Sequence, residues 1–352
     1  MPGIGVKHAK NLVAYTGSVE GIFEQKIKAL VTIPGINYNL AKAISNHSVF
    51  KRAEEEVEFV EKNNIQTRFY LDDDYPNRLK YCDDNPILLF GKGNFKWNPE
   101  KAISVVGTRN ATDYGYKHVK SFLSGLKEAN PYVISGMAYG IDIAAHREAL
   151  KNELVTIAVV GHGLDRLYPS VHQPVLDKMM ENGGIVTEFL SKTNPDRENF
   201  PKRNRIIAGI SDATIVIESG RKGGSIITAE LALSYSRDVF AVPGNLENKF
   251  SIGCNSLIHT QKANLVRGPK DVLKVMNWFA KRKKKSIQKS LFIELTEEEQ
   301  LIYDELKANG SCVIDELAMK LKISISKTSV NLLNMEFKGV VTTLPGKVYD
   351  LV

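Results

Sequence analysis

The 352-residue sequence is poor in cysteine and tryptophan and has no long apolar segment. Its three cysteines, Cys82, Cys254 and Cys312, form no CxxC pair. This spacing argues against a disulfide framework or a zinc ribbon and is typical of a reducing cytoplasm. No window approaches the roughly 18 apolar residues of a membrane span, and the segment from Met1 to Glu20 lacks a secretory pattern. We therefore expect a cytoplasmic protein that does not contact the membrane.

The remaining composition is that of an ordinary globular protein with a basic surplus. Hydrophobic residues make up 43% and charged residues 25% of the chain, and the formal net charge is +7. A chain of this length is expected to form about two or three domains. The positive charge favours polyanionic partners.

The first 60 residues contain an internal repeat. Pro2-Gly3-Ile4, with a helical pattern behind it, recurs 32 residues later as Pro34-Gly35-Ile36. The second copy is preceded by a helical pattern over 22–30. This arrangement predicts a helix-hairpin-helix-like helical domain over 1–60. Asn37 stands where such a turn would place its second glycine, so DNA contact and a purely structural packing role both remain possible here.

Residues 61–280 are expected to form the central, DNA-binding domain, in which apolar runs alternate with helical patterns from about residue 101. The runs are expected to be strands over 103–107, 132–135, 155–160, 184–188, 213–218 and 239–242. Helical patterns between them include 116–129, 141–150 and 226–236. The alternation predicts an α/β fold, a Rossmann-like parallel sheet with helices on both faces. Ligands meet such a sheet at the loops behind the carboxyl ends of its strands.

These loops are rich in glycine but carry no nucleotide fingerprint. The loop over 107–115 lacks the GxGxxG spacing, and the loop over 220–225 contains no GK[ST] sequence. Neither NAD nor ATP is therefore indicated, and we expect no cofactor. Glycine behind a strand lets backbone N–H groups approach an anion. Several such loops in one sheet favour a polymer of phosphates as the ligand.

A basic segment with an aromatic residue lies in the same region. Phe200 and Pro201 lead directly into Lys202-Arg203-Asn204-Arg205. Two arginines separated by one residue would diverge by about 200° on a helix, but on a first turn both could reach an anion bound beside the free N–H groups. The Phe200 ring offers a face on which a base can stack.

Four other polar residues invite a catalytic or metal-binding interpretation. Asp142 and His146 are four residues apart on one expected helix, but no third ligand is near in sequence, so we expect no metal site. Asp142 is better placed to cap that helix. Glu188 and Glu230 are isolated carboxylates, and the sequence leaves the roles of all four open.

The C-terminal part begins behind a basic run. Residues 281–295 contain five consecutive positive charges and are expected to be a linker. Residues 296–352 show a capping box, three helical patterns and a hairpin, which together predict a winged-helix domain. Its expected recognition helix carries Lys327 but no arginine, and Glu336 lies close to Lys338. A major-groove reader would show more Arg, Asn or Gln, so a protein partner is as good an interpretation as DNA.

Seven loop motifs, taken in order, resemble the DprA (Smf) family of DNA-processing proteins. They are Gly107-Thr108-Arg109 with Tyr114-Gly115, Ser135-Gly136 with Gly140-Ile141-Asp142, Gly163-Leu164-Asp165 with Tyr168-Pro169, Phe200-Pro201 with Arg203-Asn204-Arg205, Gly223-Gly224-Ser225 with Thr228, Val239 to Gly244, and Gly253-Cys254-Asn255. The resemblance implies a homodimer that binds single-stranded DNA without hydrolysing a nucleotide, so the chain is expected not to be an enzyme. It also implies a partnership with the RecA recombinase in natural transformation, with incoming strands protected and then loaded.

The resemblance further implies which residues bind the strand. They are Gly107, Thr108, Arg109, Gly136, Phe200, Lys202, Arg203, Asn204, Arg205, Gly223, Gly224 and Ser225. We add Arg197 and Lys222 because of their charge and position. Two alternatives belong to other classes. Gly223-Gly224 with Thr228 and Glu230 is distantly similar to nucleotide phosphoribohydrolases, and the winged helix could serve a regulator of duplex DNA.

Overall fold

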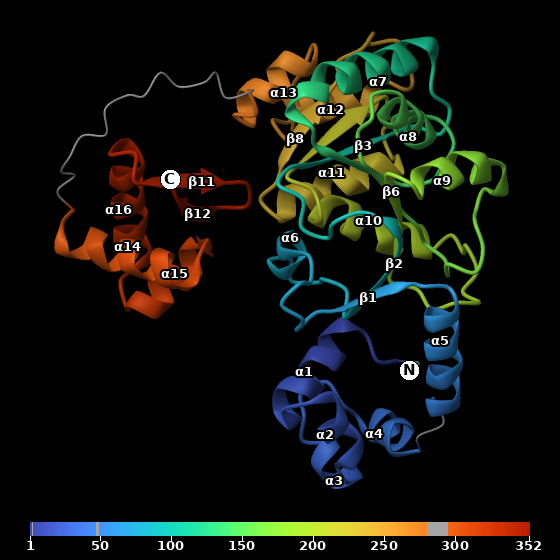
Figure 1. Ribbon diagram of the computed structural model, residues 1–352, viewed down its shortest axis with the longest axis vertical. Helices are drawn as coiled ribbons and strands as arrows, with labels where there is room; N and C mark the ends of the chain where they lie inside the picture. Colours follow the sequence, from blue (N-terminus) through green and yellow to red (C-terminus); the bar gives the residue numbers. More distant parts are fainter. Residues whose placement is uncertain (2, 47–48, 280–294) are drawn as a thin grey trace.

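The computed structural model describes residues 1, 3–46, 49–279 and 295–352 (Figure 1). The predicted linker over 281–295 lies outside the described residues except for its last position. In the described part of the chain, no helix combines the length and apolar character needed to cross a membrane.

The N-terminal region is helical, as predicted. Its helices are α1 (Val6–Thr16), α2 (Val19–Glu24), α3 (Ile27–Leu30), α4 (Tyr38–Ser45) and α5 (Phe50–Lys62). The single helix expected over 22–30 is divided, because Gln25 takes an extended conformation between α2 and α3.

The two copies of the sequence repeat pack against each other. Gly3 and Gly35 both have positive φ angles, +80° and +86°. A Cβ on Gly3 would lie 2.8 Å from Leu40, and one on Gly35 would lie 3.0 Å from His8. Leu40 lies five residues after Gly35, and His8 lies five residues after Gly3. The glycine of each copy therefore contacts the equivalent residue of the other copy. The hairpin glycines thus serve the packing of this domain, and the Asn37 side chain caps α4 by accepting from the Leu40 N–H at 2.9 Å.

The central region is built on a nine-stranded sheet. Its strands are β1 (Gln66–Phe69), β2 (Leu88–Asn94), β3 (Ala102–Gly107), β4 (Tyr132–Ser135), β5 (Thr156–Val159), β6 (Gly183–Thr187), β7 (Ala213–Ile217), β8 (Asp238–Ala241) and β9 (Asn264–Leu265), in the spatial order β1-β2-β6-β5-β4-β3-β7-β8-β9. From β6 to β9 all neighbours are parallel, whereas β1 and β2 are antiparallel additions at one edge. All six predicted strands are present, and β1, β2 and β9 were not predicted.

Helices cover both faces of this sheet, as the α/β pattern predicted (Figure 1). The central helices are α6 (Asn77–Lys80), α7 (Asp113–Leu126), α8 (Ile141–Lys151), α9 (Gln173–Met179), α10 (Asn199–Gly209), α11 (Gly224–Ser234), α12 (Ile252–His259) and α13 (Pro269–Val275). One apolar cluster joins α7, α8 and α13 to the sheet through residues such as Phe122, Ala145 and Val272. Another joins α10 and α11 to its other face through Ile206 and Ala229. Nearly all residues of the inner strands β3 to β8 are buried, so these strands are mainly apolar rather than alternating.

The chain reverses its direction of growth between β3 and β7. From β3 it builds outward through β4, β5 and β6, then returns to place β7 on the other side of β3. The loops behind β3 and β7 therefore leave the sheet in opposite directions. Such a switch point opens a crevice at the carboxyl ends of the two strands.

The C-terminal region is a winged helix, as predicted. It contains α14 (Glu297–Asn309), α15 (Ile314–Leu321), α16 (Ile325–Phe337), β10 (Cys312–Val313), β11 (Val341–Leu344) and β12 (Val348–Leu351). Ile302, Leu317 and Leu332 lie in its apolar core. The predicted capping box is present, with Thr296 and Glu299 each bonding the other's backbone N–H.

The described residues form one apolar cluster in the N-terminal region, three in the central region and one in the C-terminal region. Helix α5 contacts both the N-terminal and the central region. It contributes no residue to the N-terminal core, which it touches through a ring contact of Phe50 with Phe23 at 4.9 Å. Its buried Glu56 bonds to Ser191 of the central region. The predicted boundary between residues 60 and 61 falls within the last turn of α5.

Candidate nucleic-acid interface

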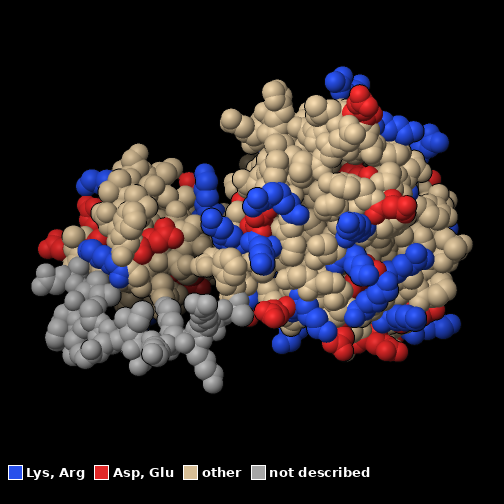
Figure 2. All heavy atoms as spheres, turned by 90° about the horizontal axis from the view of Figure 1, so that it is seen from above, with Lys and Arg blue, Asp and Glu red and all other residues tan. Residues whose placement is uncertain are grey.

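A cleft of about 780 Å³ opens at the switch point between β3 and β7. Its walls come from the loops behind these two strands, the beginnings of α10 and α11, and the loop behind β4. The predicted residues that line it are Gly107, Thr108, Arg109, Arg197, Phe200, Arg203, Asn204, Gly223, Gly224 and Ser225. In Figure 2, Lys and Arg side chains gather along one side of the large central lobe.

Close backbone packing fixes the loop behind β3. A Cβ on Gly107 would lie 2.0 Å from the carbonyl oxygen of Ile217, so no side chain fits there. The Thr108 N–H donates to the Glu218 carbonyl at 2.7 Å. The buried Glu218 carboxylate accepts from the N–H of Thr112 at 2.9 Å and from its hydroxyl at 2.5 Å. The two switch-point loops are thereby joined, and Arg109 projects from them with its side chain exposed.

The first turn of α11 forms the opposite wall. Its N-cap is Gly223, and no side chain caps the turn. Ser225 bonds to Ser219 through their hydroxyls at 2.8 Å, and the Asn204 amide donates to the Gly224 carbonyl at 3.3 Å. Backbone N–H groups at the start of an eleven-residue helix, together with the helix dipole, favour an anion at this position.

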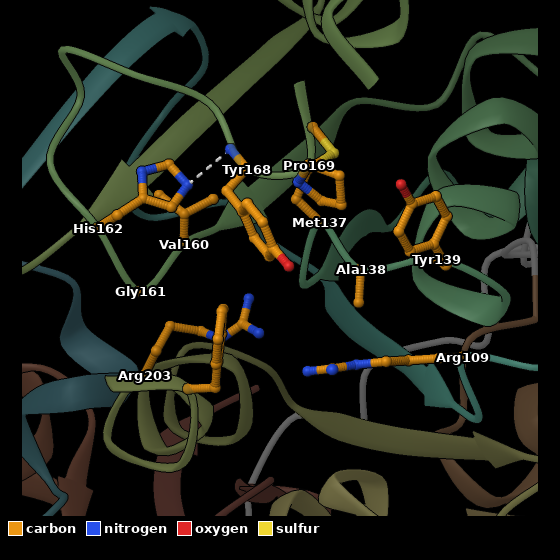
Figure 3. Close-up of a pocket in the computed structure, with 11 residues that line it drawn as sticks. Arg109, Met137, Ala138, Tyr139, Val160, Gly161, His162, Tyr168, Pro169 and Arg203 are labelled. Carbon is orange, nitrogen blue, oxygen red and sulfur yellow. Dashed lines mark hydrogen bonds between the residues drawn. The ribbon is translucent and has the colours of Figure 1, made fainter. Parts of the chain in front are cut away.

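Two aromatic rings and an arginine lie side by side at the mouth of the cleft. The Arg109 guanidinium carbon is 5.5 Å from the centre of the Phe200 ring. The Tyr168 ring centre is 6.2 Å from that of Phe200, with 38° between the ring planes. Tyr168 is 50% exposed, and Figure 3 shows it above the pocket that it shares with Arg109 and Arg203.

Tyr168 belongs to one of the seven motifs but was not among the residues predicted to bind the strand. Its N–H donates to the His162 Nε2 at 3.2 Å, which fixes the backbone of the loop behind β5. The signal that could have identified it is its place in a loop behind a parallel strand, where ligands are met.

Arg203 is an internal residue rather than a surface cation. It is 5% exposed and donates to the Val159 carbonyl. A Cβ on Gly136 would lie 2.6 Å from its Nη1 and 2.3 Å from the Asp142 Oδ2, so Gly136 leaves room for both side chains. Burial lowers the pKa of Arg203 to about 10 and raises that of Asp142 to about 6, while the attraction between the two groups opposes both shifts. In Figure 3 the guanidinium groups of Arg203 and Arg109 point toward the same space.

Arg205 lies on another side of α10 and does not line the cleft. The helix begins at Asn199, so Arg203 and Arg205 lie beyond its first turn and diverge. The expectation that one turn presents both arginines together is wrong. Arg205 forms an ion pair with Glu188, and the two side chains are 12% and 16% exposed. Burial raises the pKa of Glu188, and the Arg205 charge opposes that rise.

The other predicted residues lie near the cleft without lining it. Lys202 is exposed, with its Nζ 3.6 Å from a Glu198 carboxylate oxygen. Lys222 is exposed beside Gly223, and Gly136 lies behind Arg203. Residues that line the cleft but were not predicted include Asn110, Ala138, Asp142, Tyr168, Pro195 and Ser219.

The remaining polar candidates are structural. His146 is buried between the Thr156 hydroxyl and the Gly136 carbonyl, each 2.7 Å away. Burial lowers the pKa of His146 to about 4, which keeps it neutral near pH 7. Glu230 pairs with Lys262 at the surface. Within the described ranges, no three His, Cys, Asp or Glu side chains are grouped to hold a metal ion.

The strand order and the switch-point cleft define a Rossmann-like protein whose cleft combines glycine loops, arginines and aromatic rings. Residues 66–277 match the DNA recombination-mediator protein A family, and residues 293–347 match the DprA winged helix domain. The chain belongs to this DprA/Smf family of DNA-processing proteins, as the sequence motifs predicted.

Relatives agree with this assignment. The DNA processing protein DprA of Streptococcus pneumoniae is 42% identical over 203 residues, which are 58% of this chain and 71% of that protein. Protein Smf of Escherichia coli is 34% identical over 77% of this chain and 74% of its own. The match to the putative DprA of Mycobacterium tuberculosis, 34% identical, covers 69% of this chain and 63% of that protein.

Solved structures show the same fold. The X-ray structure of Streptococcus pneumoniae DprA superposes with a TM-score of 0.68 at 33% identity, covering 77% of this chain and 93% of that one. DNA processing protein A from Helicobacter pylori, whose structure was described for its single-stranded DNA binding mode, gives 0.55 at 26% identity, with 60% and 95% covered.

Proposed function

We propose that this protein binds single-stranded DNA in the switch-point cleft. The observation that carries the proposal is the grouping of the half-buried Phe200 ring and the exposed Tyr168 ring with Arg109 and the uncapped start of α11. Bases stack on aromatic faces whatever their identity, and phosphates are held by arginine and by backbone N–H groups. Binding is therefore expected to depend little on base sequence. The single-stranded DNA binding mode described for the Helicobacter pylori relative supports the same assignment.

The rings also explain why a single strand is favoured over a duplex. A base can stack on Phe200 only if its own face is free, and in a duplex both faces of each base are covered by neighbours. A duplex could still reach Arg109 and the start of α11 with its phosphates, but it would lose the stacking contribution of roughly 1–3 kcal/mol per base.

The acids around the cleft support binding without hydrolysis of a nucleotide. The Asp142 carboxyl group is buried and is attracted to the charge of Arg203. The Glu218 carboxylate accepts two hydrogen bonds from Thr112. A carboxylate that acted as a general base would need to reach a substrate proton or a water molecule. The phosphoribohydrolase alternative requires Glu230 in the site, but Glu230 lies at the surface with Lys262 and does not line the cleft.

The wider role is proposed from membership in the DprA/Smf family. In this role a homodimer, associated through the central domain, protects incoming strands in the cytoplasm during natural transformation. The strands are then passed to the RecA recombinase. The cleft suits this task because contacts to phosphates and base faces let a strand be held without regard to its sequence.

Fluorescence anisotropy with a labelled oligothymidylate and a duplex of equal length tests the binding proposal. Tighter binding of the single strand is expected, and equal affinity for the duplex would contradict it. Release of ribose phosphate from nucleoside monophosphates would instead support the enzyme alternative. The handover is tested by the rate of RecA filament formation on the oligonucleotide, which is expected to rise when the protein is added.

A further inference from the structure

The loop that follows β6 is held by a helix outside the matched central domain. This loop, residues 188–198, has no secondary structure of its own and leads into α10 at Asn199. Its residues Pro195 and Arg197 line the cleft, and Phe200 follows directly in α10. The helix that holds it is α5, which lies before residue 66, where the family match begins.

Glu56 and Arg52 of α5 bind every polar group of Ser191. The Ser191 N–H donates to the two Glu56 oxygens at 2.9 and 3.1 Å, and its hydroxyl donates to Glu56 Oε2 at 2.6 Å. Arg52 Nη2 donates to the Ser191 carbonyl at 2.6 Å and to Glu56 at 2.7 Å. Glu56 is 7% and Ser191 5% exposed. A buried carboxylate with this many donors is firmly fixed, and removing it would leave a buried N–H group without a partner.

The backbone immediately after Ser191 depends on this support. Lys192 has a φ of +67°, a conformation that costs a residue with a side chain on the order of 1 kcal/mol and persists where its neighbours enforce it. Its N–H donates to Asp165 at 2.8 Å, and its ammonium pairs with Glu55 of α5 at 2.8 Å. The chain is therefore clamped on both sides at the point where it turns toward the cleft.

Further bonds continue from the clamp to the aromatic platform. Thr193 accepts from the Gly163 N–H at 3.2 Å, and Asn194 accepts from Arg166 at 2.5 Å through its side chain. The Asn194 carbonyl accepts from the Asn199 side-chain amide at 3.1 Å, and Asn199 begins α10 just before Phe200. A continuous set of contacts thus links Glu56 to the ring.

We propose that Glu56 is a positioning residue of the single-strand site. Its carboxylate, with Arg52, fixes the 188–198 loop and thereby places Arg197 and Phe200 at the cleft. This inference rests on the proposed function, but its structural part can be tested without DNA. Without the clamp, binding would have to order the loop as well as contact the strand, and ordering costs affinity while the contacts themselves remain the same.

The test is made on the full chain with Glu56→Ala, and Glu58→Ala serves as the matched control because Glu58 is exposed on the same helix. Hydrogen exchange of residues 188–198 is expected to rise in Glu56→Ala alone. Affinity for a labelled oligothymidylate is expected to fall about tenfold. Glu56→Gln keeps one acceptor for the Ser191 N–H, so it is expected to lose less affinity than Glu56→Ala. The same variant replaces Glu56→Ala in these measurements if Glu56→Ala folds poorly.

A double-mutant cycle with Phe200→Ala separates positioning from a general loss of stability. If Glu56 acts through Phe200, the double variant binds only slightly more weakly than Phe200→Ala alone. The proposal is overturned if the loss of affinity in the double variant equals the product of the two single losses. It is also overturned if hydrogen exchange of residues 188–198 is unchanged in Glu56→Ala. If the wild-type protein binds no oligothymidylate, the proposed function fails, while the exchange experiment still decides whether the clamp exists.

Discussion

The switch-point cleft and the recognition helix of the winged helix both carry basic residues. The two regions differ in whether these exposed residues are paired with carboxylates. In the cleft, Arg109 and Arg197 form no salt bridge within the described parts of the chain. At the winged helix, Lys327 pairs with Glu298 at 3.0 Å and Lys338 with Glu299 at 2.6 Å. A lysine that already has a carboxylate partner must give up that partner to bind a phosphate.

The outward faces of the two regions differ as well. The cleft presents the aromatic rings of Phe200 and Tyr168 beside its cations. Helix α16 instead exposes Val330, Leu333 and Phe337, which share one side at helical spacing. The difference teaches that the number of basic residues in an element does not identify a phosphate site. What identifies it is whether the charge is free and what lies next to it.

The largest effect is expected for Arg203, because its buried guanidinium is attracted to the buried Asp142 carboxylate, whereas Arg109 is exposed. Arg203→Ala would leave Asp142 buried without its partner, so the free energy of unfolding is expected to fall by about 3–5 kcal/mol near neutral pH. Arg109→Ala, at an exposed position, is expected to leave it unchanged. Denaturant titration of both variants measures the difference. A fully stable Arg203→Ala with a reduced salt dependence of binding would show that Arg203 contacts phosphate, as the sequence alone had suggested.

The buried Asp142 and His146 are expected to give opposite pH dependences of stability. The folded-state pKa of His146 is depressed to about 4, so the folded protein binds fewer protons than the unfolded chain and stability rises with pH up to about 6.5. The pKa of Asp142 is raised to about 6, so its contribution is present at low pH and lost as pH rises from about 4 to 6.

Asp142→Asn is expected to reveal the histidine contribution. Each shift corresponds to about 3 kcal/mol, so the two nearly cancel in the wild type. In the variant, the free energy of unfolding should rise steeply between pH 4 and 6.5. Thermal or urea unfolding across that range checks this, and parallel profiles for wild type and variant would show that Asp142 does not titrate there.

Loss of the aromatic platform is expected to weaken binding without altering its salt dependence. Phe200→Ala removes a stacking partner and should cost roughly 1–3 kcal/mol of single-strand affinity. Because no phosphate contact is lost, the slope of log K against log salt should stay the same. Tyr168→Ala is expected to act in the same direction. An altered slope in either variant would indicate that the loop had moved rather than that a stacking contact was lost.

Arg109→Ala is expected to change the salt dependence that Phe200→Ala leaves intact. Loss of one phosphate contact lowers the slope of log K against log salt by about 0.7 for a single strand. Anisotropy titrations at several salt concentrations measure it. A weaker affinity with an unchanged slope would assign Arg109 to packing on Phe200 alone.

The smallest effect is expected for Lys327→Ala in α16, because Lys327 is engaged with Glu298. Affinity for single-stranded DNA and its salt slope should match the wild type in the same titrations. A loss comparable to that of Arg109→Ala would remove the distinction between the two regions and assign the winged helix to the DNA site.

The central fold could be predicted because each of the strands β3 to β8 is a mainly apolar run whose residues are nearly all buried. The strand β1 was missed because three of its four residues are polar, β9 because it has two residues, and β2 because it contains two glycines. The site was predicted in part. The glycine loops and Arg109 follow directly from their place behind strands, whereas the orientations of Arg203 and Arg205 depend on where α10 begins. That helix starts two residues before Pro201, since proline is tolerated in a first turn.

Other features depend on contacts between distant parts of the chain. Glu56 and Ser191 are 135 residues apart, and neither lies in a recognisable motif. Asp142 had been considered as a cap or a metal ligand, and its partner Arg203 follows 61 residues later. A local pattern cannot show such pairs, because they are created by the order of strands in the sheet.

Photo-crosslinking tests the central claim most directly. An oligothymidylate in which one base is replaced by iodouracil would be irradiated in complex with the full chain, and the attached residues identified by mass spectrometry. The account predicts crosslinks to Phe200 and Tyr168, and their loss in Phe200→Ala and Tyr168→Ala respectively. Crosslinks confined to the winged helix or to the N-terminal helices, with none at the cleft, would contradict it.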